Sequence, residues 1–133
     1  MTTHSVDTQW DGKTGFHSTV DGHIIRTNSD ANAGPSPKKL LLAGLAGCTG
    51  LDVVSILEKM HISIHSLQIH ADAILNEDHP RVYTGISLTY RIGGKESDKE
   101  KYEKAIRLSV DKYCGVMAML SKTANISYTL EVI

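Results

Sequence analysis

Hydrophobic and polar positions alternate with a period of two over the first third of the chain. The alternation covers residues 6–10, 16–20 and 24–25, and the turn-forming pairs Asp11-Gly12 and Asp21-Gly22 separate the three segments. A period of two places alternate side chains on opposite faces of an extended strand. The pattern therefore predicts a three-stranded antiparallel meander at the N-terminus.

A long helix is predicted to follow a loop of turn formers. Ser36 is a suitable N-cap, and Pro37 fits the first helical position, where its missing N–H is not needed. The helix should continue to about Met60. From Leu40 to Leu57 apolar or small residues occupy nearly every side of it, so a one-sided amphipathic stripe does not describe it. We expect such a helix to be enclosed on several sides.

Three glycines interrupt the apolar run of this helix. Each costs roughly 1 kcal/mol relative to alanine in a helix interior. Together they predict close packing against the helix backbone, most simply by a second helix. They are Gly44, Gly47 and Gly50.

The period of two returns after the helix. It runs from Ile62 to Ala73, with a phase change near His65-Ser66 that predicts a bulge, and it resumes from Val82 to Ile92. The intervening residues 76–80 are turn formers. These two segments predict a hairpin.

Helical spacing marks the next segment. Ser97 to Glu100 has the form of a capping box, and an apolar stripe follows it. Gly115 should break this helix, after which residues 116–120 predict a short apolar helix and residues 126–132 a last strand. The order of elements predicts an α+β fold with paired antiparallel strands. The stripe consists of Tyr102, Ile106, Ser109 and Tyr113.

Length and charge narrow the classes of function. A chain of 133 residues predicts a single domain over 1–133, small enough for an oligomer interface to supply part of its core. The net charge of −1, with scattered basic residues, argues against nucleic-acid or membrane partners. The N-terminus lacks the pattern of a secretion signal, and the uncharged run ends at Asp52, too early to span a bilayer. We expect a soluble, cytoplasmic protein.

The two cysteines, Cys48 and Cys114, are the main candidates for chemistry. Their spacing does not make a zinc site, and a disulfide between them in a reducing compartment would be transient. Burial as inert core residues is the alternative for each thiol. Cys114 precedes a glycine at a helix junction, so it could lie at a helix N-terminus as a mobile resolving thiol.

A reactive Cys48 needs a cation nearby to stabilise its thiolate. Cys48 lies about three turns into its helix, beyond the useful reach of the helix dipole, and Asp52 acts against the thiolate. The cation must then come from elsewhere in the fold or from another subunit. The candidates are Lys13, Arg26, Lys38 and Lys39.

Other kinds of site lack support in the sequence. The seven histidines follow no metal-ligand spacing, so no metal is expected. Hydrolase and phosphate-binding motifs are absent, so no bound cofactor is expected either.

Two segments resemble a known family. Residues 34–49, followed by Asp52-Val53-Val54-Ser55-Ile56-Leu57, look like the cysteine helix of the OsmC/Ohr family, and residues 110–120 resemble its second-cysteine segment. The order of strands agrees, so the resemblance covers nearly the whole chain. It implies an intertwined homodimer in which sheets from both chains wrap two long helices. It also implies that Cys48 is a peroxidatic thiol and Cys114 its resolving partner, reducing organic hydroperoxides through a sulfenic acid and an intramolecular disulfide with an external thiol reductant.

The chain departs from the family's peroxidases at the charged residues. Those enzymes use an arginine from the N-terminal strand region and a glutamate shortly after the motif proline. Here Lys38-Lys39 follow Pro37, and neither Lys13 nor Arg26 can be assigned as that arginine. Two alternatives to a thiol peroxidase therefore stay open. One is a binding protein for a small apolar or sulfur-containing ligand at the dimer interface, and the other is a structural dimer with inert thiols.

Overall fold

The structure is a computed structural model that describes all residues, 1–133. It divides into two compact units, Met1–Ala43 and Gly44–Ile133, and the division falls inside one helix. The expectation of a single domain stays a prediction.

The first unit contains the predicted meander. Strands β1 (Asp7–Trp10), β2 (Gly15–Val20) and β3 (His23–Asn28) pair antiparallel in the order β1-β2-β3. In the β2–β3 turn both Asp21 and Gly22 have positive φ, 51° and 80°, the geometry that an Asp-Gly hairpin turn requires. The apolar side chains of these strands are largely exposed, with Trp10 at 59% and Ile24 at 60%.

Helix α1 (Lys39–Lys59) begins two residues later than predicted. Ser36 caps it as expected, because its Oγ accepts a hydrogen bond from the Lys39 N–H at 3.3 Å. Within the chain only one stripe of α1 is buried, at Leu45, Thr49, Val53 and Leu57. The expected enclosure on several sides is therefore not supplied by this chain alone.

Within the chain no second helix packs on the glycines, so the predicted close packing of a second helix there stays a prediction. A methyl group added at Gly44 or Gly47 would meet nothing within 4 Å, and at Gly50 it would meet the side chain of Ile69, on a strand, at 3.2 Å.

Helix α1 is long and apolar enough to span a membrane, with a mean hydropathy of 2.0. The estimate from its uncharged run, which ends at Asp52, had been that it is too short. This is weak evidence for a membrane span, because the core helix of a soluble protein has the same length and hydropathy.

The second unit is built on a three-stranded sheet of order β4-β5-β6, formed by β4 (Ser66–Leu75), β5 (Tyr83–Gly93) and β6 (Asn125–Val132). β4 and β5 form the predicted hairpin. Residues 62–65 precede the strand, and its irregularity lies at Ile74/Leu75, so the bulge predicted near His65-Ser66 is wrong. The left-handed backbone of His61 (φ 61°) ends the helical segment, and residues 62–65 connect it to the sheet.

β6 pairs parallel to β5, which corrects the expectation of antiparallel pairing throughout. A parallel neighbour needs a long crossover, and the helical segment 96–120 provides it. The crossover consists of a 3-10 turn (Glu96–Asp98), α2 (Lys99–Leu108), a π-helical turn (Ser109–Tyr113) and α3 (Gly115–Leu120). The predicted capping box is absent, because no side chain caps α2.

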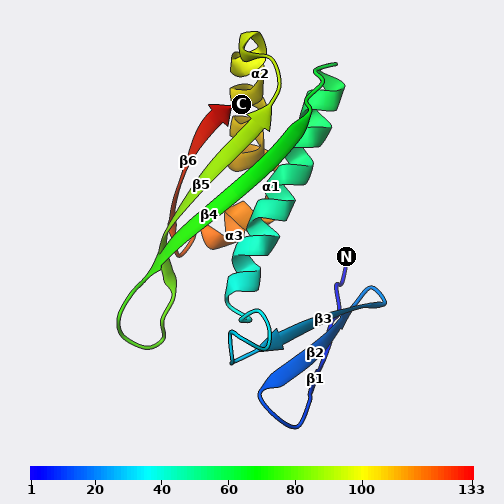
Figure 1. The fold of residues 1–133 in the computed structure, drawn as a ribbon, viewed down its shortest axis with the longest axis vertical. Helices are drawn as coiled ribbons and strands as arrows, with labels where there is room; N and C mark the ends of the chain where they lie inside the picture. Colours follow the sequence, from blue (N-terminus) through cyan, green and yellow to red (C-terminus); the bar gives the residue numbers. More distant parts are fainter. The chain divides into compact units, whose positions relative to one another are not determined.

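The helices of the second unit cover one face of the sheet (Figure 1). Alternate residues of β5 point into this core, while the intervening Ser87, Thr89 and Arg91 are on the other face. Tyr102 and Ile106 of α2 and Met117 of α3 are fully or almost fully buried. The buried side chains of β5 are Ile86, Leu88, Tyr90 and Ile92.

Candidate functional site

Both cysteines belong to the second unit. Cys48 is the tenth residue of α1 and is half-buried, and Cys114, which is 3% exposed, forms the N-cap of α3. Its Sγ accepts a hydrogen bond from the Met117 N–H at 3.3 Å. The prediction that Cys114 lies at a helix N-terminus is confirmed.

The π-helical turn determines which side chain beyond α2 continues its buried stripe and points into the core. A regular α-helix would continue the stripe from Tyr102 and Ser109 to Tyr113. The π-turn adds one residue to a single turn, which shifts the phase by roughly 100°. As a result Tyr113, predicted on the stripe, is 55% exposed, and Cys114 is buried in its place.

The surroundings of Cys114 keep its thiol protonated. Burial is the largest cause, and together with the neighbouring Cys48 thiol and the negative charge of Asp52 it raises the pKa of Cys114 to about 11. The Met117 N–H acts in the opposite direction. None of these effects comes from a cation. The resting Cys114 is therefore a protonated thiol at neutral pH.

A buried chain of hydroxyl groups begins one residue after Cys48. Thr49 Oγ1 lies 2.8 Å from the Tyr90 hydroxyl and 2.7 Å from Ser109 Oγ, and all three residues are fully buried. Ser109 Oγ donates to Asp52 Oδ2 at 2.9 Å. The chain connects α1, β5 and the π-turn.

The proton arrangement in this chain follows from the carboxylate at its end. A carboxylate only accepts, so the single Ser109 proton goes to Asp52 and Ser109 must accept from Thr49. Thr49 then has no second proton and must accept from Tyr90. The donors run in one direction, from Tyr90 through Thr49 and Ser109 to Asp52. Burial, together with the nearby Cys114, Tyr128 and Asp52, raises the pKa of Tyr90 to about 12, so it remains a donor.

Asp52 also borders a surface pocket of about 440 Å³ between α1 and the α2/π-turn segment. Its wall includes Lys59 and the exposed residue Tyr113. The hydroxyl chain thus runs from the core to the surface. The lining residues are Asp52, Ser55, Ile56, Lys59, Leu108 and Tyr113.

The predicted charge partners lie outside this unit. Lys13 is in the β1–β2 turn, where its N–H donates to Asp11 Oδ1 and its carbonyl accepts from the Trp10 indole. Arg26 is in β3, where it lies opposite His17 of β2 in the strand register. Lys38 and Lys39 are exposed at the start of α1, more than two helical turns before Cys48. Their role as activating cations stays a prediction.

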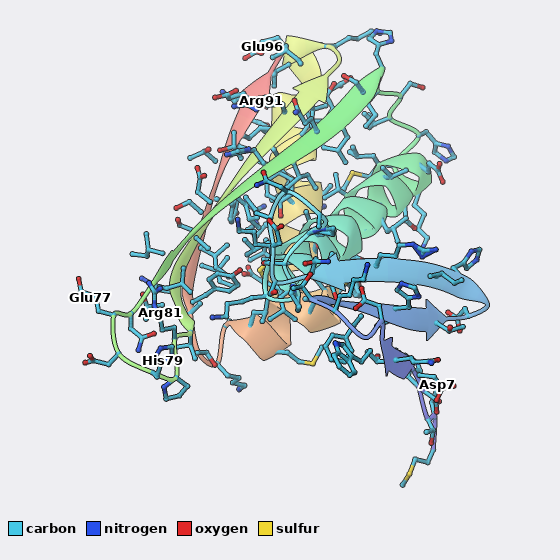
Figure 2. The ribbon with its side chains drawn as sticks, turned by 60° about the horizontal axis from the view of Figure 1, so that its bottom comes forward. Asp7, Glu77, His79, Arg81, Arg91 and Glu96 are labelled. Atoms are coloured by element: carbon cyan, nitrogen blue, oxygen red, sulfur yellow. The ribbon has the colours of Figure 1, made fainter.

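Several titratable side chains of the second unit lie at the two ends of its sheet. Figure 2 shows Glu77, His79 and Arg81 on the β4–β5 loop, and Arg91 and Glu96 at the opposite end. Arg91 is bound to Glu131 at 2.9 Å. No group of three or more His, Cys, Asp or Glu side chains is placed to hold a metal ion.

Sequence reasoning did not assign roles to three residues of the site, Thr49, Tyr90 and Ser109. A signal was present for two of them, because a hydroxyl residue on a buried apolar stripe needs a partner. Ser109 lies on the stripe of α2, and Thr49 on the buried stripe of α1. Which groups satisfy them depends on the packing of α1 against β5 and the crossover.

Comparison with known proteins assigns the chain a family. A model of the OsmC-like protein family matches residues 28–129. Protein YhfA of Escherichia coli strain K12 is 32% identical over 124 residues, which are 92% of each chain.

Solved structures agree on the fold. A hypothetical protein from Aquifex aeolicus VF5 has a TM-score of 0.86 at 27% identity, over 100% of this chain and 99% of that one. The organic hydroperoxide resistance protein OhrB of Bacillus subtilis has a TM-score of 0.67 at 21% identity, over 98% of each chain. At this identity the likeness to OhrB concerns the fold alone.

Proposed function

The chain belongs to the OsmC-like protein family, and from this premise we propose that it is a cysteine-based redox protein that reduces organic hydroperoxides. The observation that carries the proposal is the bond between Thr49, next to Cys48, and Ser109, whose turn ends at Cys114; Cys48 is the more exposed of the two thiols. The organic hydroperoxide resistance protein OhrB of Bacillus subtilis shares the fold, and we assign the peroxidatic role to Cys48 and the resolving role to Cys114.

The reaction requires two steps at the thiols. The Cys48 thiol loses its proton to solvent, the thiolate sulfur attacks the peroxide and takes one oxygen, and the O–O bond breaks. The leaving alkoxide takes up a proton from solvent to give the alcohol, so Cys48 becomes a sulfenic acid. Cys114 then attacks this sulfur, the S–OH bond breaks, an S–S bond forms and the Cys114 proton leaves with hydroxide as water. An external thiol reductant returns both cysteines to the reduced state.

A second copy of the chain is the partner that we propose for the exposed apolar surfaces. On α1, Leu51 is 76% exposed and Val54 37%, while Trp10, Phe16 and Ile24 of the first unit are also exposed. Surfaces of this kind on a soluble protein mark interaction sites. In a homodimer each chain would enclose the open side of α1 and could supply the cation that Cys48 lacks in its own unit. We place the protein in the cytoplasm, where thiols are kept reduced.

A binding protein without peroxidase activity is the second candidate function. Two observations favour it: the raised pKa of Cys114, to which no cation contributes, and Lys38-Lys39 in place of a glutamate. Such a protein would hold a small apolar or sulfur-containing ligand at the dimer interface.

The deciding experiment is a single turnover of the reduced protein. One equivalent of cumene hydroperoxide, with hydrogen peroxide in parallel, is followed by intact mass and non-reducing peptide mapping. A peroxidase loses about 2 Da and yields a Cys48–Cys114 peptide, faster with the organic peroxide. Cys48→Ser should abolish the reaction, whereas Cys114→Ser should stop at the sulfenic acid, which dimedone traps. An unchanged parent protein after minutes would overturn the peroxidase proposal.

A further inference from the structure

We propose that Ser109 is the positioning residue for the resolving thiol: it ties the π-turn before Cys114 to the helix that carries Cys48, so that the disulfide can close. The inference rests on the proposed two-thiol function and deepens it. It assigns a role to a residue that touches neither the peroxide nor the reacting sulfur atoms.

Ser109 makes this connection with both its backbone and its side chain. Its carbonyl accepts the Cys114 N–H at 2.8 Å, which closes the π-turn. Its hydroxyl bonds to Thr49 at 2.7 Å and to Asp52 at 2.9 Å, both on α1. Thr49 is adjacent to Cys48 in sequence, so a single serine spans the path between the two cysteine segments.

The side-chain contacts of Ser109 define one geometry. The residue is fully buried, and its donor and acceptor are both used, because Asp52 takes its proton and Thr49 supplies one. Moving the π-turn away from α1 would leave the hydroxyls of Ser109 and Thr49 without these partners in a dry site, which costs free energy. The buried pairing therefore holds the turn in place.

Disulfide closure without peroxide tests the inference separately from the peroxidase proposal. The reduced protein is equilibrated with reduced and oxidised glutathione, quenched with acid, alkylated and weighed. In this exchange the protein dithiol and one oxidised glutathione give the protein disulfide and two reduced glutathiones. The equilibrium constant measures how well the fold presents the two thiols to each other.

We expect Ser109→Ala, which removes both side-chain hydrogen bonds of Ser109, to lower this constant at least tenfold, since tenfold corresponds to only about 1.4 kcal/mol. Thr49→Val, which keeps the side-chain volume, should lower it by a smaller factor because Asp52 still holds Ser109. Thr49→Ser restores the hydroxyl and should stay within about twofold of the parent. Ser127→Ala is the matched control, because it deletes an exposed hydroxyl whose neighbour Ser87 is 3.5 Å away.

The outcomes separate the two proposals. If Ser109→Ala and Thr49→Val close the disulfide as readily as Ser127→Ala, Ser109 does not position Cys114. An equal loss in Thr49→Ser and Thr49→Val would also overturn the inference, since only one of them lacks the hydroxyl. If Ser109→Ala does not fold, the Thr49 pair decides. A parent protein that closes the disulfide normally but does not react with peroxides refutes the peroxidase proposal and leaves the positioning result intact.

Discussion

Ser109 donates its hydroxyl proton to Asp52 across 2.9 Å, and this bond joins the crossover that carries Cys114 to the helix that carries Cys48. Asp52 therefore affects the site in two ways. Its oxygen holds the π-turn in place, and its charge raises the pKa of Cys114.

Replacing Asp52 by Asn separates these two effects. The amide oxygen still accepts the Ser109 proton, but the negative charge is gone, so the pKa of Cys114 should fall and its thiolate should form at lower pH. In a Cys48→Ser background, the pH midpoint of Cys114 alkylation by iodoacetamide should move down.

Asp111→Asn in the same background is the matched control, because Asp111 is exposed and does not contribute to the shift. A midpoint that stays in place or rises in Asp52→Asn would contradict the assigned effect of the Asp52 charge.

The stability of the reduced protein should fall in alkaline solution. Burial raises the pKa of Cys114 from 9.0 to about 11. Between these values the unfolded chain loses a proton that the folded chain keeps, so unfolding becomes more favourable as pH rises. A shift of this size corresponds to about 3 kcal/mol once both pKa values are passed.

Urea unfolding at pH 8 and pH 10.5, with reductant present, measures the change. The Cys114→Ala protein should lose less stability over this interval, because the contribution of the Cys114 thiol is gone. A smaller loss should remain, since the folded protein also raises the pKa of Tyr90, to about 12. Equal losses in the two proteins would argue against a buried, protonated Cys114.

Deleting Lys112 should restore a regular α-helical turn. The deletion removes one residue from the π-turn, so Cys114 rotates by roughly 100° away from the buried stripe. We expect faster alkylation of Cys114 and loss of disulfide closure in the glutathione assay. Lys112→Ala keeps the chain length and should behave as the parent. Normal closure in the deletion variant would mean that the added residue does not determine the direction of Cys114.

Charge on the exposed side of α1 should weaken the proposed homodimer. Leu51 is 76% exposed in the single chain, and Leu51→Glu would place a carboxylate in an apolar interface. Sedimentation velocity should show a shift towards monomer, whereas Lys101→Glu, on the exposed side of α2, should leave the assembly unchanged. An unaltered Leu51→Glu dimer would place the interface elsewhere.

The sequence allowed the elements to be predicted because their periods are clear. The meander, the helix capped by Ser36 and the β4–β5 hairpin all follow from local patterns. The parallel pairing of β6 does not, since strand direction depends on the path of residues 96–120 across the sheet. The α+β class was therefore predictable, but this part of the topology was not.

The candidate site divides in the same way. The two cysteines, Cys48 and Cys114, could be named as candidates from the sequence, and the helix junction at Gly115 indicated where the second thiol would lie. The resemblance supplied their expected roles. The π-turn and the partners of Ser109 arise from contacts between segments distant in sequence, such as Thr49 with Tyr90. No periodicity within one segment reports such contacts.

The one-way order of the hydroxyl chain depends on the negative charge of a single residue, Asp52. If a proton bound to Asp52, the carboxyl group could donate to Ser109, and Ser109 and Thr49 could each turn to donate towards Tyr90. The buried phenol would then be an acceptor from the chain instead of its first donor. The donor direction of every hydrogen bond in this buried chain thus depends on one carboxylate at the rim of a surface pocket.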